Sequence, residues 1–272
     1  MVALLVLLAL LMRWVFGLLD DTVPSVLPPD EQCVVRVGEV SDELSLEQSR
    51  NAAIIVAEAQ RRGLPARASS IALATAMQES SLRNIDYGDR DSVGLFQQRP
   101  SQGWGTVEQI MDPWYSAGKF YDHLVEVDGW QSEDLNDVAQ KVQRSGVPDG
   151  YRKHIEAAKA WGSALTGHSP AAVSCINRGT QASGAADGTK MLARAFGKRV
   201  SVTTGQAVVT LNAPQATDLW SATQLFMMTT GSSGVVRVDV GQQNWTNQGD
   251  ALASWQGTPS PSSTETVITL RA

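Results

Sequence analysis

The first hydrophobic pattern along the chain is an almost unbroken apolar run from Val2 to Leu19, which contains one charge at Arg13. A helix of about 20 apolar residues spans a bilayer, so the run is just long enough for a transmembrane anchor over residues 1–20. A cleaved secretory signal and a buried core helix are the two alternatives. The anchor and the signal both place the rest of the chain outside the cytoplasm, either on the cell membrane or secreted.

A mostly helical pattern follows after residues 21–44, which carry several prolines and little periodicity and which we interpret as a stalk. Ser45 and Gln48 have the spacing of a capping box and predict a helix start. The apolar stretch from Ala66 to Glu79 predicts a helix that is buried on all sides. We expect three more helices, which begin at the Asp112-Pro113 pair, at Asn136 and at Tyr151. Residues 45–166 are therefore predicted to form a mainly α domain.

The pattern changes again in the last third of the chain. Residues 167–189 are rich in Gly, Ala and Ser and are typical of a linker. In residues 190–272 the valines at 236, 238 and 240 alternate with charged residues, as in a half-buried strand, and a helix-like segment covers 218–229. The sequence thus predicts a small α+β domain at the C-terminus and an α+β class for the whole chain.

Charge and composition exclude several classes of function. The chain has 22 basic and 28 acidic residues and a net charge of −6, which argues against a nucleic-acid partner. Two cysteines are too few for a zinc site with four cysteine ligands. The three histidines show no ligand spacing, so we predict neither a metal nor another cofactor. A metal transporter is physically implausible, because one marginal span cannot enclose a path.

The two cysteines, Cys33 and Cys175, lie on either side of the predicted helical domain. Two distant cysteines in an exported protein most simply form a disulfide. The alternative is a pair of unrelated buried thiols.

The most informative segment for chemistry begins at Glu79, where the buried helix ends. A carboxyl group that emerges from an apolar helix into a cleft is partly desolvated, which raises its pKa and lets it carry a proton near neutral pH. A polar loop with Asp86, Asp89 and Asp91 follows, and these aspartates either supply a second catalytic carboxylate or simply solvate the loop. The loop ends in the segment Gly94–Gln98.

Glu79-Ser80, a polar loop and then Gly-Leu-Phe-Gln from Gly94 resemble the signature of soluble lytic transglycosylases and goose-type lysozymes. The resemblance covers residues 48 to 162, and residues 76 to 105 are also similar to exported actinobacterial proteins with a lysozyme-like domain. It implies a lysozyme-like fold for the helical domain. It also implies that Glu79 is the single general acid/base that cleaves the glycosidic bond between N-acetylmuramic acid and N-acetylglucosamine.

The same resemblance suggests the remaining site residues. A hydrolase needs a second acid, for which Asp89 is the candidate, whereas a lytic transglycosylase, which we favour, does not. The candidate substrate contacts are Ser80, Gln97, Gln98, Trp104, Gln143 and Tyr151. One departure stands out, because Gln143-Arg144 occupies the place of the Tyr-Asn pair that lines the sugar cleft in the family.

Two functional hypotheses therefore remain. The first is a peptidoglycan lytic enzyme, and Glu79 favours it. The second is a catalytically weak or inactive lysozyme-like module for cell-wall binding or assembly, and Gln143-Arg144 favours it. The partners expected are peptidoglycan glycan strands, the membrane through the N-terminal helix, and a protein bound by the C-terminal domain.

Overall fold

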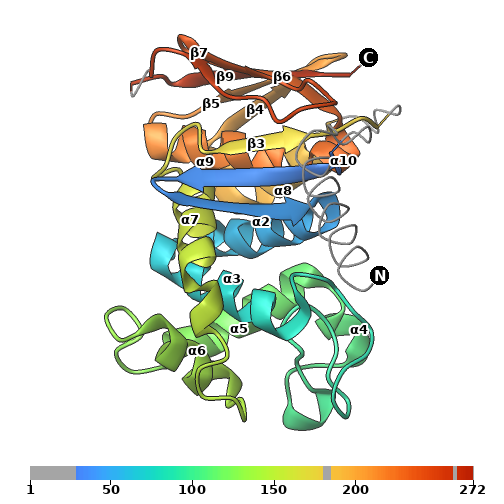
Figure 1. Cartoon of the computed structure of the whole chain (residues 1–272), viewed down its shortest axis with the longest axis vertical. Coiled ribbons are helices and arrows are strands. Elements are labelled where there is room, and N and C mark those ends of the chain that lie inside the picture. The colour runs from blue at the N-terminus through green and yellow to red at the C-terminus, as the bar shows by residue number, and fades with distance from the viewer. Residues whose placement is uncertain (1–28, 180–184, 260–261, 272) are drawn as a thin grey trace, which may run out of the picture. The chain divides into compact units, whose positions relative to one another are not determined.

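The computed structural model describes residues 29–179, 185–259 and 262–271. The apolar run at residues 2–19 lies outside this part of the chain, so the anchor stays a prediction. No helix within the described residues is long and apolar enough to cross a membrane. The fold is α+β, as predicted, and from Glu31 onward the chain forms one compact unit. Figure 1 shows a large sheet at one end of this unit and helices α4 (Val107–Ile110) and α6 (Leu135–Gln143) at the other.

A small antiparallel sheet begins in the segment that the sequence suggested as a stalk. Strand β1 (Gln32–Val37) pairs with β2 (Val40–Ser45), and Gly38, with φ of 57°, supplies the turn between them. Strand β3 (Val173–Ile176) pairs with the other edge of β1 and gives the order β2-β1-β3. The stalk interpretation therefore does not hold for residues 32–44, because their polar alternation belongs to a paired strand and not to a free segment.

The helices between β2 and β3 follow the predicted order with two differences, because the short helix at Val107–Ile110 was not predicted and the last helix begins at Ile155 instead of Tyr151. Their bounds are α2 Leu46–Arg61, α3 Ala66–Ser80, α4 Val107–Ile110, α5 Pro113–Val125, α6 Leu135–Gln143 and α7 Ile155–Leu165, with 3₁₀ turns at Pro100–Gln102 and Arg152–His154. The capping box of Ser45 and Gln48 is present, and Asp112 caps α5 before Pro113. The prediction that Asn136 caps α6 was wrong, because the carboxylate of Asp134 accepts from the Asn136 N–H.

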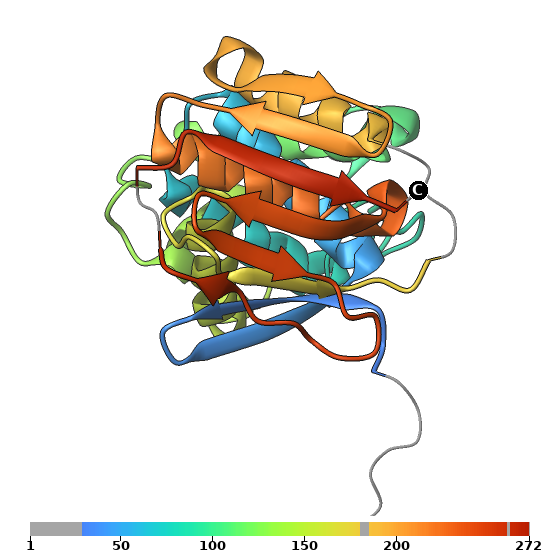
Figure 2. The same ribbon diagram turned by 90° about the horizontal axis from the view of Figure 1, so that it is seen from above.

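The C-terminal part forms a six-stranded antiparallel sheet with the order β4-β5-β9-β6-β7-β8. The strands are β4 Ser201–Thr204, β5 Val208–Asn212, β6 Val235–Val240, β7 Gln243–Thr246, β8 Gln256–Gly257 and β9 Glu265–Leu270. The helices are α8 Ala186–Phe196, α9 Ala216–Met227 and α10 Thr230–Ser233, with a 3₁₀ turn at Gly197–Arg199. Helices α8 and α9 lie beneath one face of the sheet (Figure 2).

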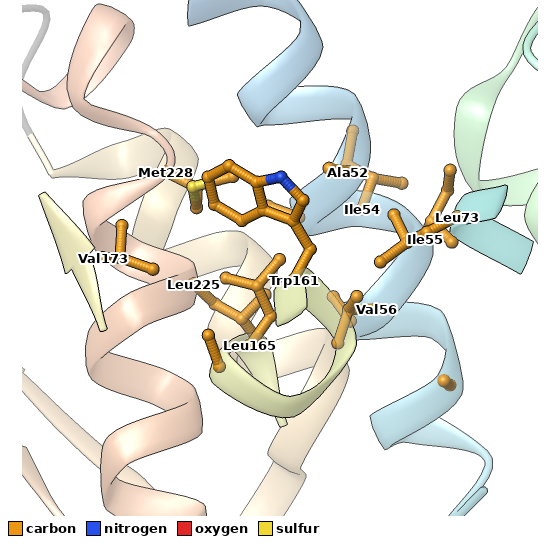
Figure 3. Packing of buried hydrophobic residues seen from close by; sticks show 14 of the residues in the cluster. Ala52, Ile54, Ile55, Val56, Leu73, Trp161, Leu165, Val173, Leu225 and Met228 are labelled. Carbon is orange, nitrogen blue, oxygen red and sulfur yellow. The ribbon is translucent and has the colours of Figure 1, made fainter. Parts of the chain in front are cut away.

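The hydrophobic core is continuous between the helical part and the C-terminal part. The fully buried Trp161 of α7 lies between α2, which carries Ile55, and α9, which carries Leu225 (Figure 3). The buried amide of Gln224 in α9 donates to the carbonyl of Ala164 at 2.6 Å and accepts from two backbone N–H groups beside β3. Residues 167–179 and 185–189 of the predicted linker thus include strand β3 and the start of α8, and they pack on this shared core.

The predicted disulfide is confirmed. Cys33 of β1 and Cys175 of β3 stand opposite each other in the antiparallel register and are bonded across a sequence separation of 142. Both cysteines are completely buried. Because stable disulfides of this kind form in oxidising compartments, the bond indicates an extracytoplasmic location for this part of the chain.

Candidate active site

Glu79 stands in the last turn of α3, where the chain reverses direction. The two residues after the helix, Ser81 and Leu82, both have positive φ, at 53° and 58°. Side chains of α2 hold this reversal in place, because Gln48 donates to the Ser81 carbonyl and Asn51 donates to the Leu82 carbonyl, each at 2.8 Å. The position of Glu79 is therefore fixed by packing between two helices and not by a loop.

The carboxyl of Glu79 is largely buried, and a tyrosine contacts it directly. The hydroxyl of Tyr151, which is fully buried, donates to Oε1 of Glu79 at 2.7 Å. Burial raises the pKa of Glu79, and the hydrogen bonds from Tyr151 and Gln143 lower it but only in part. Burial and the adjacent carboxylate raise the pKa of Tyr151, so its hydroxyl keeps its proton and acts as a donor. Tyr151 thus holds one carboxyl oxygen of Glu79 in a fixed position.

The segment Gly94–Gln98 packs against the end of α3. Ser80 Oγ donates to the Leu95 carbonyl at 2.8 Å, and Gln143 Nε2 of α6 donates to the Phe96 carbonyl at 2.7 Å. The amide of Gln98 is 1% exposed and donates to the Ser116 carbonyl of α5. The segment therefore connects α5 and α6 to the end of α3, which carries Glu79.

A cleft opens beside Glu79 and has a volume of ≈ 290 Å³. It is lined by Glu79, Asp89, Ser92, Gln97, Gln98, Arg99, Gln102, Trp104, Gln143, Arg144 and Ser145. A second pocket of ≈ 590 Å³ shares Gln102, Trp104, Gln143 and Arg144 with the first and extends to His123, Glu126, Val127, Lys141 and Val142. Because the two pockets share these four residues, they adjoin each other, and we refer to them together as the groove.

The predicted site residues fall into two groups in this geometry. Glu79, Asp89, Gln97, Gln98, Trp104 and Gln143 line the cleft. Ser80 and Tyr151 are buried behind it, where they hold the Gly94–Gln98 segment and Glu79 in place. Sequence analysis did not include the exposed Arg144 among the substrate contacts, although it noted that the Gln143-Arg144 pair replaces the Tyr-Asn pair of the lytic transglycosylase motif.

The three loop aspartates are not equivalent. The side chain of Asp89 is 92% exposed and lies 3.9 Å from the Arg90 guanidinium. Asp91 accepts from Arg99 and from the Ser101 N–H, both at 2.8 Å, and these bonds hold the pKa of Asp91 well below its usual range. Asp86 is exposed and does not line the cleft. Asp89 is therefore the second carboxylate of the cleft, and water surrounds it.

The aromatic side chains around the groove serve both core and surface. Trp104 is partly exposed and its ring lies 4.3 Å from that of His123, so the two rings form one wall of the second pocket. Trp130 is buried in the core, and the guanidinium of Arg194 covers Trp114 at 4.1 Å.

Among the described residues there is no cluster of three or more His, Cys, Asp or Glu side chains that could hold a metal ion.

The sequence matches no protein-family model and is not significantly similar to any curated protein. A partly desolvated carboxyl group with one oxygen held by a tyrosine, at the wall of an open groove, is an arrangement that suits proton transfer to a bound ligand. The rest of the cleft lining combines amides, hydroxyls and one indole ring with the charged side chains of Asp89, Arg99 and Arg144, which are groups that bind polar ligands.

Proposed function

We propose that the chain is a peptidoglycan lytic enzyme that cleaves the glycosidic bond between N-acetylmuramic acid and N-acetylglucosamine. The observation that carries the proposal is the half-buried Glu79, which is held by Tyr151 and faces an open groove. The Glu-Ser and Gly-Leu-Phe-Gln motifs, which resemble those of lytic transglycosylases and goose-type lysozymes, are consistent with this role. The proposed fold of residues 45–166 is lysozyme-like.

In the first step, protonated Glu79 donates its proton to the glycosidic oxygen. The bond between C1 and that oxygen breaks, the leaving sugar departs with the new hydroxyl, and positive charge develops on the remaining ring. The raised pKa of Glu79 favours the protonated carboxyl that this step requires. The Tyr151 hydroxyl bond then stabilises the carboxylate that proton transfer creates.

In the second step, the Glu79 carboxylate takes the proton from the 6-hydroxyl of the same muramic acid residue. The oxygen of that hydroxyl forms the new bond to C1, and the product is a 1,6-anhydro sugar. One carboxyl group is sufficient for both steps. The exposure of Asp89 favours this course over hydrolysis, because a solvated side chain is poorly placed to orient a single water molecule.

The polar lining of the cleft supports a saccharide ligand. Gln97 has a backbone φ of 48°, and its side-chain amide donates to the carbonyls of Tyr87 and Gly94 at 3.2 and 3.3 Å. Its amide oxygen thus remains a candidate acceptor for hydroxyl or N-acetyl groups. The indole of Trp104 offers an apolar face for a sugar ring.

The experiment that tests the proposal is muropeptide analysis of purified cell wall after incubation with the wild type and with Glu79→Gln. We expect 1,6-anhydro ends from the wild type and no release above background from the variant. The matched control is Glu156→Gln, whose carboxyl is 70% exposed on α7 and which should behave as the wild type. Reducing ends would identify a hydrolase. Equal release of muropeptides by the wild type and by Glu79→Gln would refute the proposal that the chain is an enzyme.

A wall-binding module without catalysis is the second candidate, and the Gln143-Arg144 pair in the cleft favours it. Such a module would bind wall fragments through the groove but release no product. We further propose that the N-terminal apolar run holds the chain at the cell membrane, or directs its secretion, and that the part with the six-stranded sheet contacts a protein partner. Membrane fractionation with and without residues 1–20 tests the anchor.

A further inference from the structure

Arg144 is an exposed arginine of the groove, located at the C-terminal end of α6. It follows α6 directly, in a left-handed backbone conformation with φ of 52°, and its N–H bonds to the Gln140 carbonyl at 2.8 Å. Its side chain is exposed and lines both the cleft of Glu79 and the second pocket. The preceding residue, Gln143, also lines both pockets, but its amide donates to the Phe96 carbonyl.

The other long cations of the groove are already paired. Arg99 donates to Asp91 at 2.8 Å, and Lys141 forms an ion pair with Glu133. The side chain of Arg144 forms neither a hydrogen bond nor an ion pair with any residue that the structure describes. A guanidinium presents a planar fork of donors that matches a carboxylate, and within this groove Arg144 is the cation left available for a ligand.

A neutral sugar chain gives a guanidinium no charged partner. Muramic acid, in contrast, carries a carboxylate on its lactyl group, or a peptide with its own carboxylates when that group is substituted. We propose that Arg144 binds a carboxylate carried by the muramic acid residue of the substrate and so fixes which sugar occupies the site next to Glu79. The assignment of the ligand as peptidoglycan rests on the proposed function.

The arrangement of the groove supports this specificity. Arg144 and Gln143 are neighbours in the chain, and both line the cleft that Glu79 also lines. The acidic residue of the second pocket, Glu126, has its Oε2 3.8 Å from Nδ1 of His123. An alternative role for Arg144 is to interact with the negative end of the α6 dipole, and that role predicts an effect on stability alone.

Calorimetric binding to the Glu79→Gln protein tests the inference without turnover. The probes are a neutral N-acetylglucosamine tetrasaccharide, a peptide-free alternating tetrasaccharide with lactyl carboxylates, its lactyl amide, and the peptide-bearing form. We expect a carboxylate-bearing probe to bind about tenfold more tightly than its neutral counterpart, which corresponds to about 1.4 kcal/mol. Preference for the peptide-free acid identifies the lactyl carboxylate, whereas preference for the peptide-bearing form alone identifies a peptide carboxylate.

Adding Arg144→Ala should reduce the ratio between charged and neutral probes to about one, and Arg144→Lys should restore part of it. The matched control is Arg83→Ala, which removes an exposed arginine outside the groove and should keep the ratio. The inference is overturned if the ratio survives Arg144→Ala, if Arg144→Ala lowers only the unfolding free energy, or if no probe binds. Binding with the expected ratio but without wall cleavage by the wild type would instead refute the proposed catalysis.

Discussion

The hydroxyl of Tyr151 donates a 2.7 Å hydrogen bond to Oε1 of Glu79, across 72 residues of sequence. The bond joins the end of α3 to the segment just before α7, so two distant parts of the chain together position the Glu79 carboxyl group. It favours the charged carboxylate, whereas burial favours the neutral acid. The pKa of Glu79 is set by the balance of these two effects, and each can be changed separately.

Tyr151→Phe should shift the alkaline limb of the pH profile of kcat/KM to higher pH. Loss of the hydrogen bond raises the pKa of Glu79 further, and the acid form required for catalysis then persists to higher pH. We expect kcat to fall about tenfold, because the carboxylate formed in the reaction loses a donor. Tyr121→Phe is the matched control, since it removes a buried hydroxyl that donates to the Ile55 carbonyl. A limb that stays in place in Tyr151→Phe would contradict the role given to this bond.

Glu79→Gln should stabilise the protein at neutral pH by about 1 kcal/mol. The folded-state pKa of Glu79 is raised above its ordinary value of 4.5, so the folded state binds the proton more tightly than the unfolded state. The stabilisation that comes from this tighter proton binding is fully present below pH 4.5, and it is lost as pH rises through the pKa of Glu79 in the folded state. Urea unfolding of both proteins over this pH range should show that the wild type loses stability relative to Glu79→Gln as pH rises. Parallel curves would show that Glu79 is not desolvated.

Asp89→Asn should lower the rate of wall cleavage by no more than about twofold, because the side chain is 92% exposed. Glu79→Gln should lower it by about 10²–10⁴. A steady-state assay with one wall preparation compares the two variants directly. If Asp89→Asn matches Glu79→Gln in its loss, and reducing ends replace anhydro ends, Asp89 is the base of a hydrolase.

Replacement of both Cys33 and Cys175 with alanine should lower the free energy of unfolding by about 5 kcal/mol, since the bond closes a loop with a sequence separation of 142. Urea denaturation measures the loss, and reduction of the wild type should reproduce most of it. Mass spectrometry of the non-reduced protein should detect the linked peptide. Free thiols in the oxidised folded protein would contradict the bond.

Gln98→Met should lower stability by about 1–3 kcal/mol, because it removes the buried hydrogen bond to Ser116. Gln97→Met, by contrast, should mainly raise KM, since Gln97 lines the cleft and its donors reach only loop carbonyls. Thermal unfolding and kinetics on the same preparations separate the two effects. Equal stability losses would mean that both amides are structural.

Local signals in the sequence were reliable where short-range physics decides the structure. The capping box at Ser45, the buried helix that ends near Glu79 and the Asp112-Pro113 start all occur as predicted. Each depends on bonds within four residues or on a helix that is apolar on every side. The disulfide was accessible as well, because the chain offers a single possible pair.

Contacts between segments that are far apart in the sequence could not be predicted from such local patterns. Strand β1 gains its partner β3 about 140 residues later, so residues 32–37 looked like a stalk before that pairing was visible. The buried Gln224 that joins α9 to α7 and β3 gives no local sign of its role. In the candidate site, the motifs identified Glu79, but the free side chain of Arg144 emerged only when its neighbours were seen to be paired elsewhere.

The Cys33–Cys175 bond also determines how the molecule carries mechanical load. Tension applied between the chain before Cys33 and the chain after Cys175 passes through the sulfur atoms and bypasses the 141 residues between them. Those residues include Glu79, Tyr151 and the whole groove. A pull along the chain would therefore leave the Glu79–Tyr151 geometry unstretched while the C-terminal sheet bears the force.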